Sequence, residues 1–179
     1  MQKSKYLEVL LFWFDKDHKK KWFVKDKDFD DEITFKFHYL YNDIATKFNY
    51  LDRSLEEILA AIVVLDQFSR NMFRDSPKAF ATDAQALTLT KYFIHNSIDQ
   101  LLSNECKHFV YMPLMHSENL EDQELCVKLL EFDHSACEYA KIHRDIIKRF
   151  NRFPHRNSIF SRESTIEELE FLKERNSSF

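Results

Sequence analysis

Residues 29–48, FDDEITFKFHYLYNDIATKF, decide the fold class of this chain. Their apolar side chains recur at steps of three and four residues, a spacing that places them on one face of an α-helix. The same spacing returns over residues 55–65, 84–94, 119–132 and 133–151. No stretch shows the alternating pattern of a strand, and no linker divides the chain. The sequence therefore predicts an all-α protein of about eight helices, forming a single domain over residues 1–179.

Several local signals predict how these helices begin and end. Ser76 before Pro77 is a typical helix start, and Ser164 with Glu167 or Thr165 with Glu168 can form a capping box. A helix over residues 102–110 is expected to stop before Pro113, because proline lacks the backbone N–H that a helix needs.

The N-terminal residues combine an apolar helix with a charged connection. Residues 6–14 are apolar nearly all round, which predicts a helix that is buried on most sides. In the lysine-rich connection over residues 15–28, Trp22 and Phe23 are expected to anchor the chain to the core.

The composition excludes several classes of function. The chain contains no glycine, and glycine supplies the positive-φ positions of phosphate-binding loops and of turns that present a nucleophilic serine. The net charge of −4 argues against binding nucleic acid by charge alone. No apolar run approaches a membrane span. Three cysteines without a paired spacing predict free thiols in a reducing compartment, so we expect a cytoplasmic protein without a membrane partner.

The segment LDQFSRNMFR at residues 65–74 places polar side chains among apolar ones. Its polar side chains are Asp66, Gln67, Arg70, Asn71 and Arg74. The acid and the two arginines recur every four residues, so they can pair along one helix face. Charges in apolar surroundings are usually paired, which favours a structural network between helices. Alternatively, one arginine holds a carboxylate or phosphate, for which its planar guanidinium is suited.

A second polar segment, YMPLMHSENLEDQ at residues 111–123, carries His116, Glu118 and Gln123. The histidine and the glutamate flank an expected helix start, where backbone N–H groups favour anions. A metal site can be drawn from these two residues with His143 and His155. The chain contains no spacing that is diagnostic of a metal site, such as His-Glu-x-x-His, so no metal or other cofactor is predicted.

Positive charge is concentrated between residues 141 and 162, where phenylalanines interrupt it. The cations are Lys141, Arg144, Lys148, Arg149, Arg152, Arg156 and Arg162. Aromatic residues at this density favour burial, which predicts cations close to a packed core. His143 lies on an apolar helix face, where a structural core histidine is more frequent than a catalytic base. After Pro154, the side chains of His155, Arg156 and Asn157 either cap the preceding helix or form a site.

Seven segments follow one another in an order that identifies a resemblance. They are VLLFWF (9–14), FDDEI (29–33), LDQFSRNMFR (65–74), FATDAQAL (80–87), YMPLMHSE (111–118), RFNRFPHRN (149–157) and SREST (161–165). This pattern resembles the bacterial uncharacterised family catalogued as domain of unknown function 924. The resemblance implies an all-α fold similar to tetratricopeptide-like helical arrays, and it implies no activity. The family pattern has proline at Ser69 and glycine at Asn151 and Ser161, so the loop around Ser161 is expected to differ in shape.

Three functions follow from these motifs. The first is binding of a small anionic ligand or acidic peptide in one pocket. Its lining would be Asp66, Gln67, Arg70, Asn71, Arg74, His116, Gln123, Arg152, His155, Arg156 and Asn157. The second is a hydrolase-type enzyme in which His116 or His143 acts with Glu118 as an acid–base pair. The third is a helical scaffold for protein interactions, with purely structural polar segments. Nucleic acid is the partner that the sequence favours least.

Overall fold

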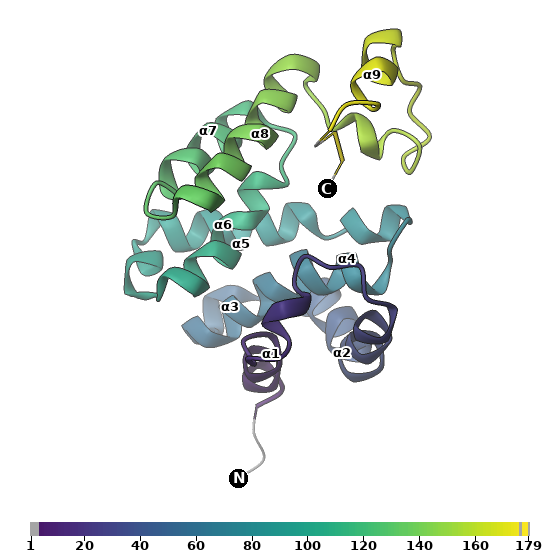
Figure 1. Ribbon diagram of the computed structural model, residues 1–179. Coiled ribbons are helices and arrows are strands. Elements are labelled where there is room, and N and C mark those ends of the chain that lie inside the picture. Colours follow the sequence, from purple (N-terminus) through teal and green to yellow (C-terminus); the bar gives the residue numbers. More distant parts are fainter. Residues whose placement is uncertain (1–3, 176, 179) are drawn as a thin grey trace. The chain divides into compact units, whose positions relative to one another are not determined.

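The computed structural model describes residues 4–175, 177 and 178, and within them it contains helices and no β-strand, so the all-α prediction is confirmed (Figure 1). The α-helices are α1 (Lys5–Trp13), α2 (Lys27–Lys47), α3 (Leu55–Ile62), α4 (Ser69–Met72), α5 (Asp83–His95), α6 (Asn104–Met115), α7 (Leu120–Leu129), α8 (His134–Phe150) and α9 (Ile166–Phe171). Short 3-10 helices cover Lys19–Lys21, Tyr50–Asp52, Pro77–Phe80, Ile98–Leu101 and Pro154–Arg156. None of the described helices has the length and apolar character that crossing a membrane requires.

The chain divides into two compact units, Met1–Val110 and Tyr111–Phe179. The first unit is built around α2, whose periodic apolar residues are buried as the sequence predicts. They are Phe29, Ile33, Phe37, Leu40, Tyr41 and Ile44. The side chain of Asp26 caps α2 by accepting a hydrogen bond from the Phe29 backbone N–H. The tetratricopeptide-like arrangement and the single domain stay predictions.

Two expectations for the N-terminal segment are wrong. Helix α1 is buried on one side only, because Val9, Phe12 and Trp13 face the core while Leu11 is 51% exposed. Trp22 is an anchor, since its Nε1–H donates to the Trp13 carbonyl at 2.9 Å and its ring packs on Phe109. Phe23 is 75% exposed. A side chain that immediately follows an inward-facing one in a turn points away from the core.

Helices α3 and α4 belong to one helical run that a π-helix, Val63–Phe68, interrupts. All six residues of the π-helix are buried, so this stretch has no solvent-exposed face. The hydroxyls of Ser69 and Thr82 both donate to the Leu65 carbonyl at 2.7 Å. Side-chain hydroxyls therefore supply hydrogen bonds to the π-helix in addition to those of its backbone.

Helix α6 corrects the prediction made from Pro113, because the helix continues past this residue to Met115. Proline removes a single backbone donor, and this loss falls close to the helix end, where few bonds remain to be disrupted. The backbone N–H of His116 still donates to the Met112 carbonyl at 3.0 Å. Gln123 then donates through Nε2 to the Met115 carbonyl at 2.6 Å, which satisfies the helix end.

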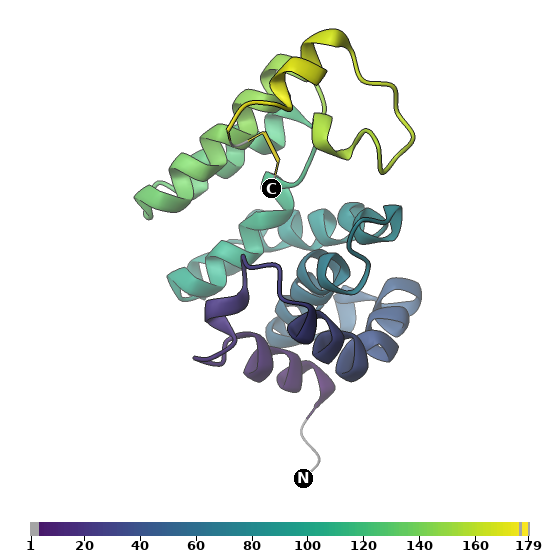
Figure 2. The same cartoon turned by 45° about the vertical axis from the view of Figure 1, so that its right-hand side comes forward.

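The second unit contains α7 and α8, which pack against each other as Figures 1 and 2 show, and the segment that ends in α9. Asn119 caps α7, and α8 ends at Asn151, whose φ of 56° is left-handed. Of the two capping boxes that the sequence allows, Thr165 with Glu168 is the one that begins α9. Ser161 also has a positive φ, of 53°, although serine suits this conformation poorly.

Candidate functional site

In the first unit, Arg70 on α4 is bound by carboxylates of its own unit. Its guanidinium donates to both carboxylate oxygens of Asp83, at 3.0 and 3.1 Å, and to the Asp66 carbonyl at 2.6 Å. Burial acts to lower the pKa of Arg70, but the carboxylates of Asp66 and Asp83 outweigh it and raise this pKa. Gln67 donates to the Asp66 carboxylate at 2.6 Å. These contacts form a hydrogen-bonded network that begins in the π-helix.

Asn71 and Arg74 form a second network, with Asp30 in the first turn of α2. Asn71 Nδ2 donates to Asp30 Oδ1 at 2.7 Å, and the Arg74 guanidinium donates to both oxygens of the same carboxylate. The expectation that Arg74 shares a helix face with Arg70 is wrong, because α4 ends at Met72. Residues 65–74 therefore bind two acids that lie outside the segment: Arg70 binds Asp83, and Asn71 and Arg74 bind Asp30.

In the second unit, Glu118 connects the turn before α7 to the segment that follows α8. Its carboxylate accepts two hydrogen bonds from Arg162, at 2.8 and 3.0 Å, and one from the Phe153 backbone N–H at 2.8 Å. Burial raises the pKa of Glu118, but the hydrogen bonds from Arg162 and Phe153 outweigh it, so this pKa lies below its usual range. Glu118 is therefore an ionised acceptor that holds two segments together.

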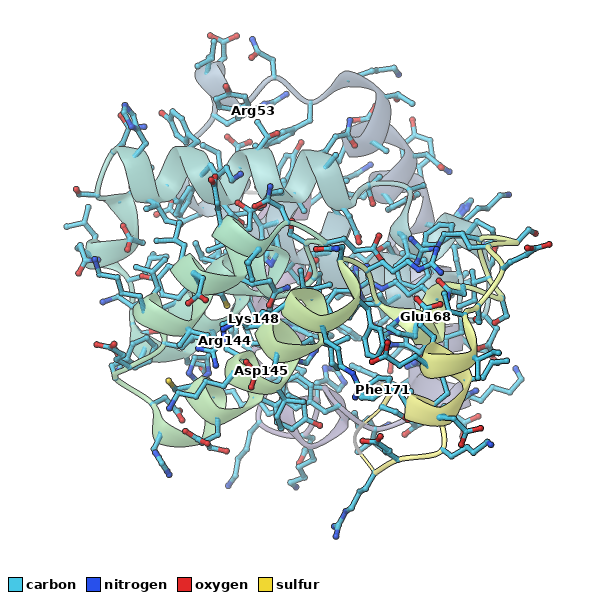
Figure 3. The ribbon with its side chains drawn as sticks, turned by 90° about the horizontal axis from the view of Figure 1, so that it is seen from above. Arg53, Arg144, Asp145, Lys148, Glu168 and Phe171 are labelled. Carbon is cyan, nitrogen blue, oxygen red and sulfur yellow. The ribbon has the colours of Figure 1, made fainter. Side chains whose placement is uncertain are left out.

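Glu168 holds Arg152 and Asn157. Arg152 donates to the two carboxylate oxygens of Glu168 at 2.6 and 2.7 Å, and Asn157 Nδ2 donates to Glu168 at 3.3 Å and to Ser164 at 3.0 Å. The hydrogen bond from Arg152 is the main reason that the pKa of Glu168 is lowered to about 2. Figure 3 shows Glu168 and Phe171 on α9, which packs beside α8. Sequence reasoning found Glu168 only as a capping residue.

A group of cationic and imidazole side chains surrounds the buried ring of Phe153, and we call Phe153, His143, His155 and Arg156 the Phe153 cluster. The His143 and His155 rings lie 5.7 and 5.6 Å from the Phe153 ring centroid, and the Arg156 guanidinium carbon lies 4.4 Å from it. His143 and Arg156 are only 4% and 6% exposed. Arg156 also donates to the backbone carbonyl of His116 at 3.0 Å, which brings the 116–118 turn to the cluster.

Both histidines of the cluster are held neutral. Burial, reinforced by His116, Arg156 and His155, lowers the pKa of His143 to about 3. Burial and the neighbouring Arg156 lower the pKa of His155 to about 4, against an opposing contribution from Glu118. A catalytic acid or base needs a pKa near the working pH. The lowered values for Glu118 and the two histidines therefore favour hydrogen bonding over proton transfer.

Buried polar atoms of this unit that have no hydrogen-bond partner among the described residues include three side-chain atoms, Gln123 Oε1, Asn157 Oδ1 and Arg162 Nε. A buried polar atom without a partner is costly, and such atoms frequently mark places where water or a ligand binds. Two of the three belong to the turn over residues 157–162, in which the Arg162 backbone N–H donates to the Asn157 carbonyl at 2.8 Å.

Residues 9–176 match the sequence model of a family described as bacterial protein of unknown function (DUF924). The chain is a member of the DUF924 family. Its structure is similar to that of a protein of unknown function from Agrobacterium tumefaciens, with 35% identity and a TM-score of 0.88, over 95% of this chain and 97% of that chain. No curated protein matches the chain.

In this DUF924 protein, the predicted site residues fall into groups. In the second unit, His143, His155 and Arg156 lie around the Phe153 ring, and Glu118 accepts from the Phe153 backbone N–H. His116 meets Arg156 through its backbone carbonyl, and Arg152 and Asn157 are bound to Glu168. Gln123 instead holds the end of α6. That the polar residues of segment 65–74 line one pocket together with those of the second unit stays a prediction. Among the described residues, no three His, Cys, Asp or Glu side chains are grouped so that they could hold a metal ion.

The acids Asp30, Asp83 and Glu168 were not recognised from the sequence as partners of these arginines. Each lies in the first turn of its helix, where acidic residues are common for local reasons. A sequence signal that could have indicated Asp30 and Asp83 is their place beside buried residues in the segments FDDEI and FATDAQAL. That signal identifies an inward-facing acid, but it does not say which arginine the acid meets.

Proposed function

We propose that this DUF924 protein binds a small anionic ligand at the Phe153 cluster. The observation that carries the proposal is the buried guanidinium of Arg156, whose carbon lies 4.4 Å from the centroid of the Phe153 ring that His143 and His155 also contact. Stacking on a ring fixes the plane of the guanidinium, and the N–H groups at its edge are then directed at oxygen acceptors. Attraction between a cation and an anion is also stronger in a buried environment than in water.

The neighbouring arginines form ion pairs within the protein, which favours a structural role for them over ligand binding. Arg152 is bound by Glu168, Arg162 by Glu118 and Arg149 by Glu167. These pairs hold the segment after α8 in position around Phe153. Within that segment, the buried donor Arg162 Nε has no partner among the described residues, which adds a second group suited to an oxygen of a ligand.

The acid–base enzyme is less well supported by the same geometry. The Glu118 carboxylate is occupied by Arg162 and by the Phe153 backbone, and its pKa is lowered rather than raised. A binding site needs none of these groups to titrate. An acidic peptide shares its carboxylate with a small anion, so it belongs to the same ligand chemistry.

Calorimetric titration of the full chain with inorganic phosphate and with acetate, near neutral pH and at low ionic strength, tests the proposal. Arg156→Gln is expected to weaken binding by about tenfold to a hundredfold, because a charge-assisted hydrogen bond contributes about 1.5–3 kcal/mol. Arg149→Gln is the matched control, since it removes the same charge from an exposed site in the same basic segment. Equal binding by both variants and the unchanged protein would overturn the proposal, as would absence of binding together with no co-purified anion in native mass spectrometry.

A further inference from the structure

We propose that the outward face of α2 binds a second copy of this chain, and that the two copies pair there with their α2 helices antiparallel. This surface lies in the first unit, outside the Phe153 cluster, and its role does not depend on the proposed function. Two observations lead to it, an exposed aromatic pair on α2 and the order of hydrogen-bonding side chains on either side of Phe35.

The aromatic pair lies on the side of α2 that is opposite its buried face. Phe35 is 91% exposed and Tyr39 is 73% exposed. They are four residues apart, so they are neighbours on the helix surface. The Nζ atom of Lys5, from the neighbouring α1 in Figure 1, lies 4.9 Å from the Tyr39 ring centroid and restricts this ring. Exposed aromatic side chains that lie together are typical of surfaces where proteins bind one another.

Polar side chains continue this face in both directions along the helix. Those that precede Phe35 are acidic acceptors, and those that follow it carry hydrogen-bond donors. We call the whole set the α2 stripe, and its residues are Asp28, Asp31, Glu32, Phe35, His38, Tyr39 and Asn42. Glu32 is partly exposed and the other members are exposed. Phe35 therefore separates an acidic half of the α2 stripe from a half that donates.

This order is self-complementary in an antiparallel pair of helices. A two-fold axis at Phe35 sets the acidic half of one copy against the donating half of the other. Asp31 and Glu32 then meet His38 and Tyr39 of the second copy, and Asp28 meets Asn42 of the second copy. A parallel pair would set acid against acid, which is unfavourable. Complementary charge and hydrogen bonding thus favour a second copy in the antiparallel arrangement.

The contacts that these residues make within their own helix leave them able to bind a second copy. Asp31 pairs with Lys27 at 2.5 Å and Glu32 with Lys36 at 3.2 Å. Exposed ion pairs of this kind contribute little to stability, so both acids can exchange partners at small cost. The Asn42 amide donates to His38 Nδ1 at 3.4 Å, so His38 Nε2 carries hydrogen and is a donor.

The size of the surface sets the affinity that we expect. Helix α2 has 21 residues, which corresponds to a length of about 31 Å. Contact along one such helix is small beside stable interfaces, which bury about 1,200–2,000 Å² in total. We therefore expect a weak dimer with a Kd of about 10–100 µM.

Sedimentation velocity of the full chain, over concentrations from about tenfold below to about tenfold above this Kd, measures the dimer. Phe35→Ser is expected to weaken it about tenfold or more, because an aromatic side chain at the centre of an interface contributes much of the affinity. Phe23→Ser is the matched control, since Phe23 is a 75% exposed phenylalanine outside the α2 stripe. This control is expected to leave the Kd unchanged within about twofold. Circular dichroism of each variant checks that the fold is retained.

Two charge variants test the antiparallel arrangement independently of Phe35. His38→Glu sets an acid against the acidic half of the second copy, and Asp31→Lys sets a cation against the donating half. Each variant alone is expected to dimerise more weakly than the unchanged chain. A mixture of the two is expected to form mixed dimers about as readily as the unchanged chain, because the introduced lysine then meets the introduced glutamate.

The outcomes are distinct. A chain that stays monomeric over the whole concentration range overturns the proposal, whatever else the α2 stripe binds. A dimer that Phe35→Ser and Phe23→Ser leave equally strong uses another surface, and it also overturns the proposal. If Phe35→Ser weakens the dimer but the two charge variants do not pair in a mixture, the antiparallel arrangement is wrong.

Discussion

Comparison of Asp30 with its neighbour Asp31 tests whether the hydrogen bonds from Asn71 and Arg74 to Asp30 stabilise the fold. Asp30 lies in the first turn of α2 and Asp31 follows it directly, so replacement by alanine removes a carboxylate near the helix N-terminus in each case. Asp30 accepts hydrogen bonds from Asn71 and Arg74, whereas Asp31 pairs only with the exposed Lys27 among the described residues. The difference between the two variants therefore isolates the contacts of Asp30 with residues 71 and 74.

The expected magnitude follows from these contacts. The bond from Asn71 contributes about 1 kcal/mol, and the two bonds from Arg74 contribute about 1.5–3 kcal/mol as a charge-assisted pair. Arg74 has a side-chain exposure of 31%, so solvent screening reduces the second figure. We expect Asp30→Ala to lower the free energy of unfolding by about 2–3 kcal/mol and Asp31→Ala by less than about 0.5 kcal/mol.

Urea unfolding followed by tryptophan fluorescence is the suitable assay. The chain has two tryptophans, Trp13 and Trp22, and both lie in the unit Met1–Val110, so the signal reports the unit that contains Asp30. With an m-value of about 2 kcal/mol per molar urea, Asp30→Ala should lower the midpoint by about 1–1.5 M. If both variants shift the midpoint equally, Asn71 and Arg74 are not committed to Asp30, and the structural interpretation of this network is refuted.

Three further predictions concern the second unit and the cysteines. Ser161→Gly should raise the free energy of unfolding, measured by thermal circular dichroism, by about 0.5–1 kcal/mol, because Ser161 has a φ of 53°; no gain would contradict strain at this position. Burial lowers the pKa of His143 to about 3 from 6.5, so the unfolded chain binds more protons and stability should fall as pH decreases from 6.5 toward 3. Urea midpoints measured by circular dichroism across this range should fall less steeply for His143→Phe than for the unchanged chain, and identical slopes would count against the burial of a neutral ring. Burial raises the pKa of the Cys126 thiol to about 12, so a thiol reagent should label the partly exposed Cys106 first and leave Cys126 and the buried Cys137 unlabelled in the folded protein. Peptide mass spectrometry measures this order, and equal labelling rates would refute it.

Local patterns were sufficient for most of the helices. The apolar residues of α2 predict its buried face, because one face of a long amphipathic helix must be covered whatever it packs against. The cap at Asp133 and the left-handed Asn151 similarly delimit α8. The prediction that a helix stops before Pro113 was wrong because the effect of a proline depends on how much helix follows it. The prediction that Phe23 is buried was wrong because an apolar residue in a charged turn does not show which side of the turn faces the core.

The candidate site required information that local patterns do not contain. The sequence places His155 and Arg156 directly after Phe153, so their proximity follows from the chain. The approach of His143 depends on α8 ending at Asn151 and on the chain then turning back toward the helix. The ion pair between Glu118 and Arg162 joins residues that are far apart in the sequence. Only the folded chain shows which acid binds which arginine.

The π-helix Val63–Phe68 gives the chain a place where its length can change. The Ser69 backbone N–H donates to the Val64 carbonyl, five residues earlier, and an α-turn would hold one residue fewer over the same stretch. Deletion of one residue here can be absorbed by a return to α-helical geometry, with the loss of one buried side chain and with α3 and α4 still facing their neighbours. The same deletion in the middle of α2 would rotate every later side chain by about 100° about the helix axis.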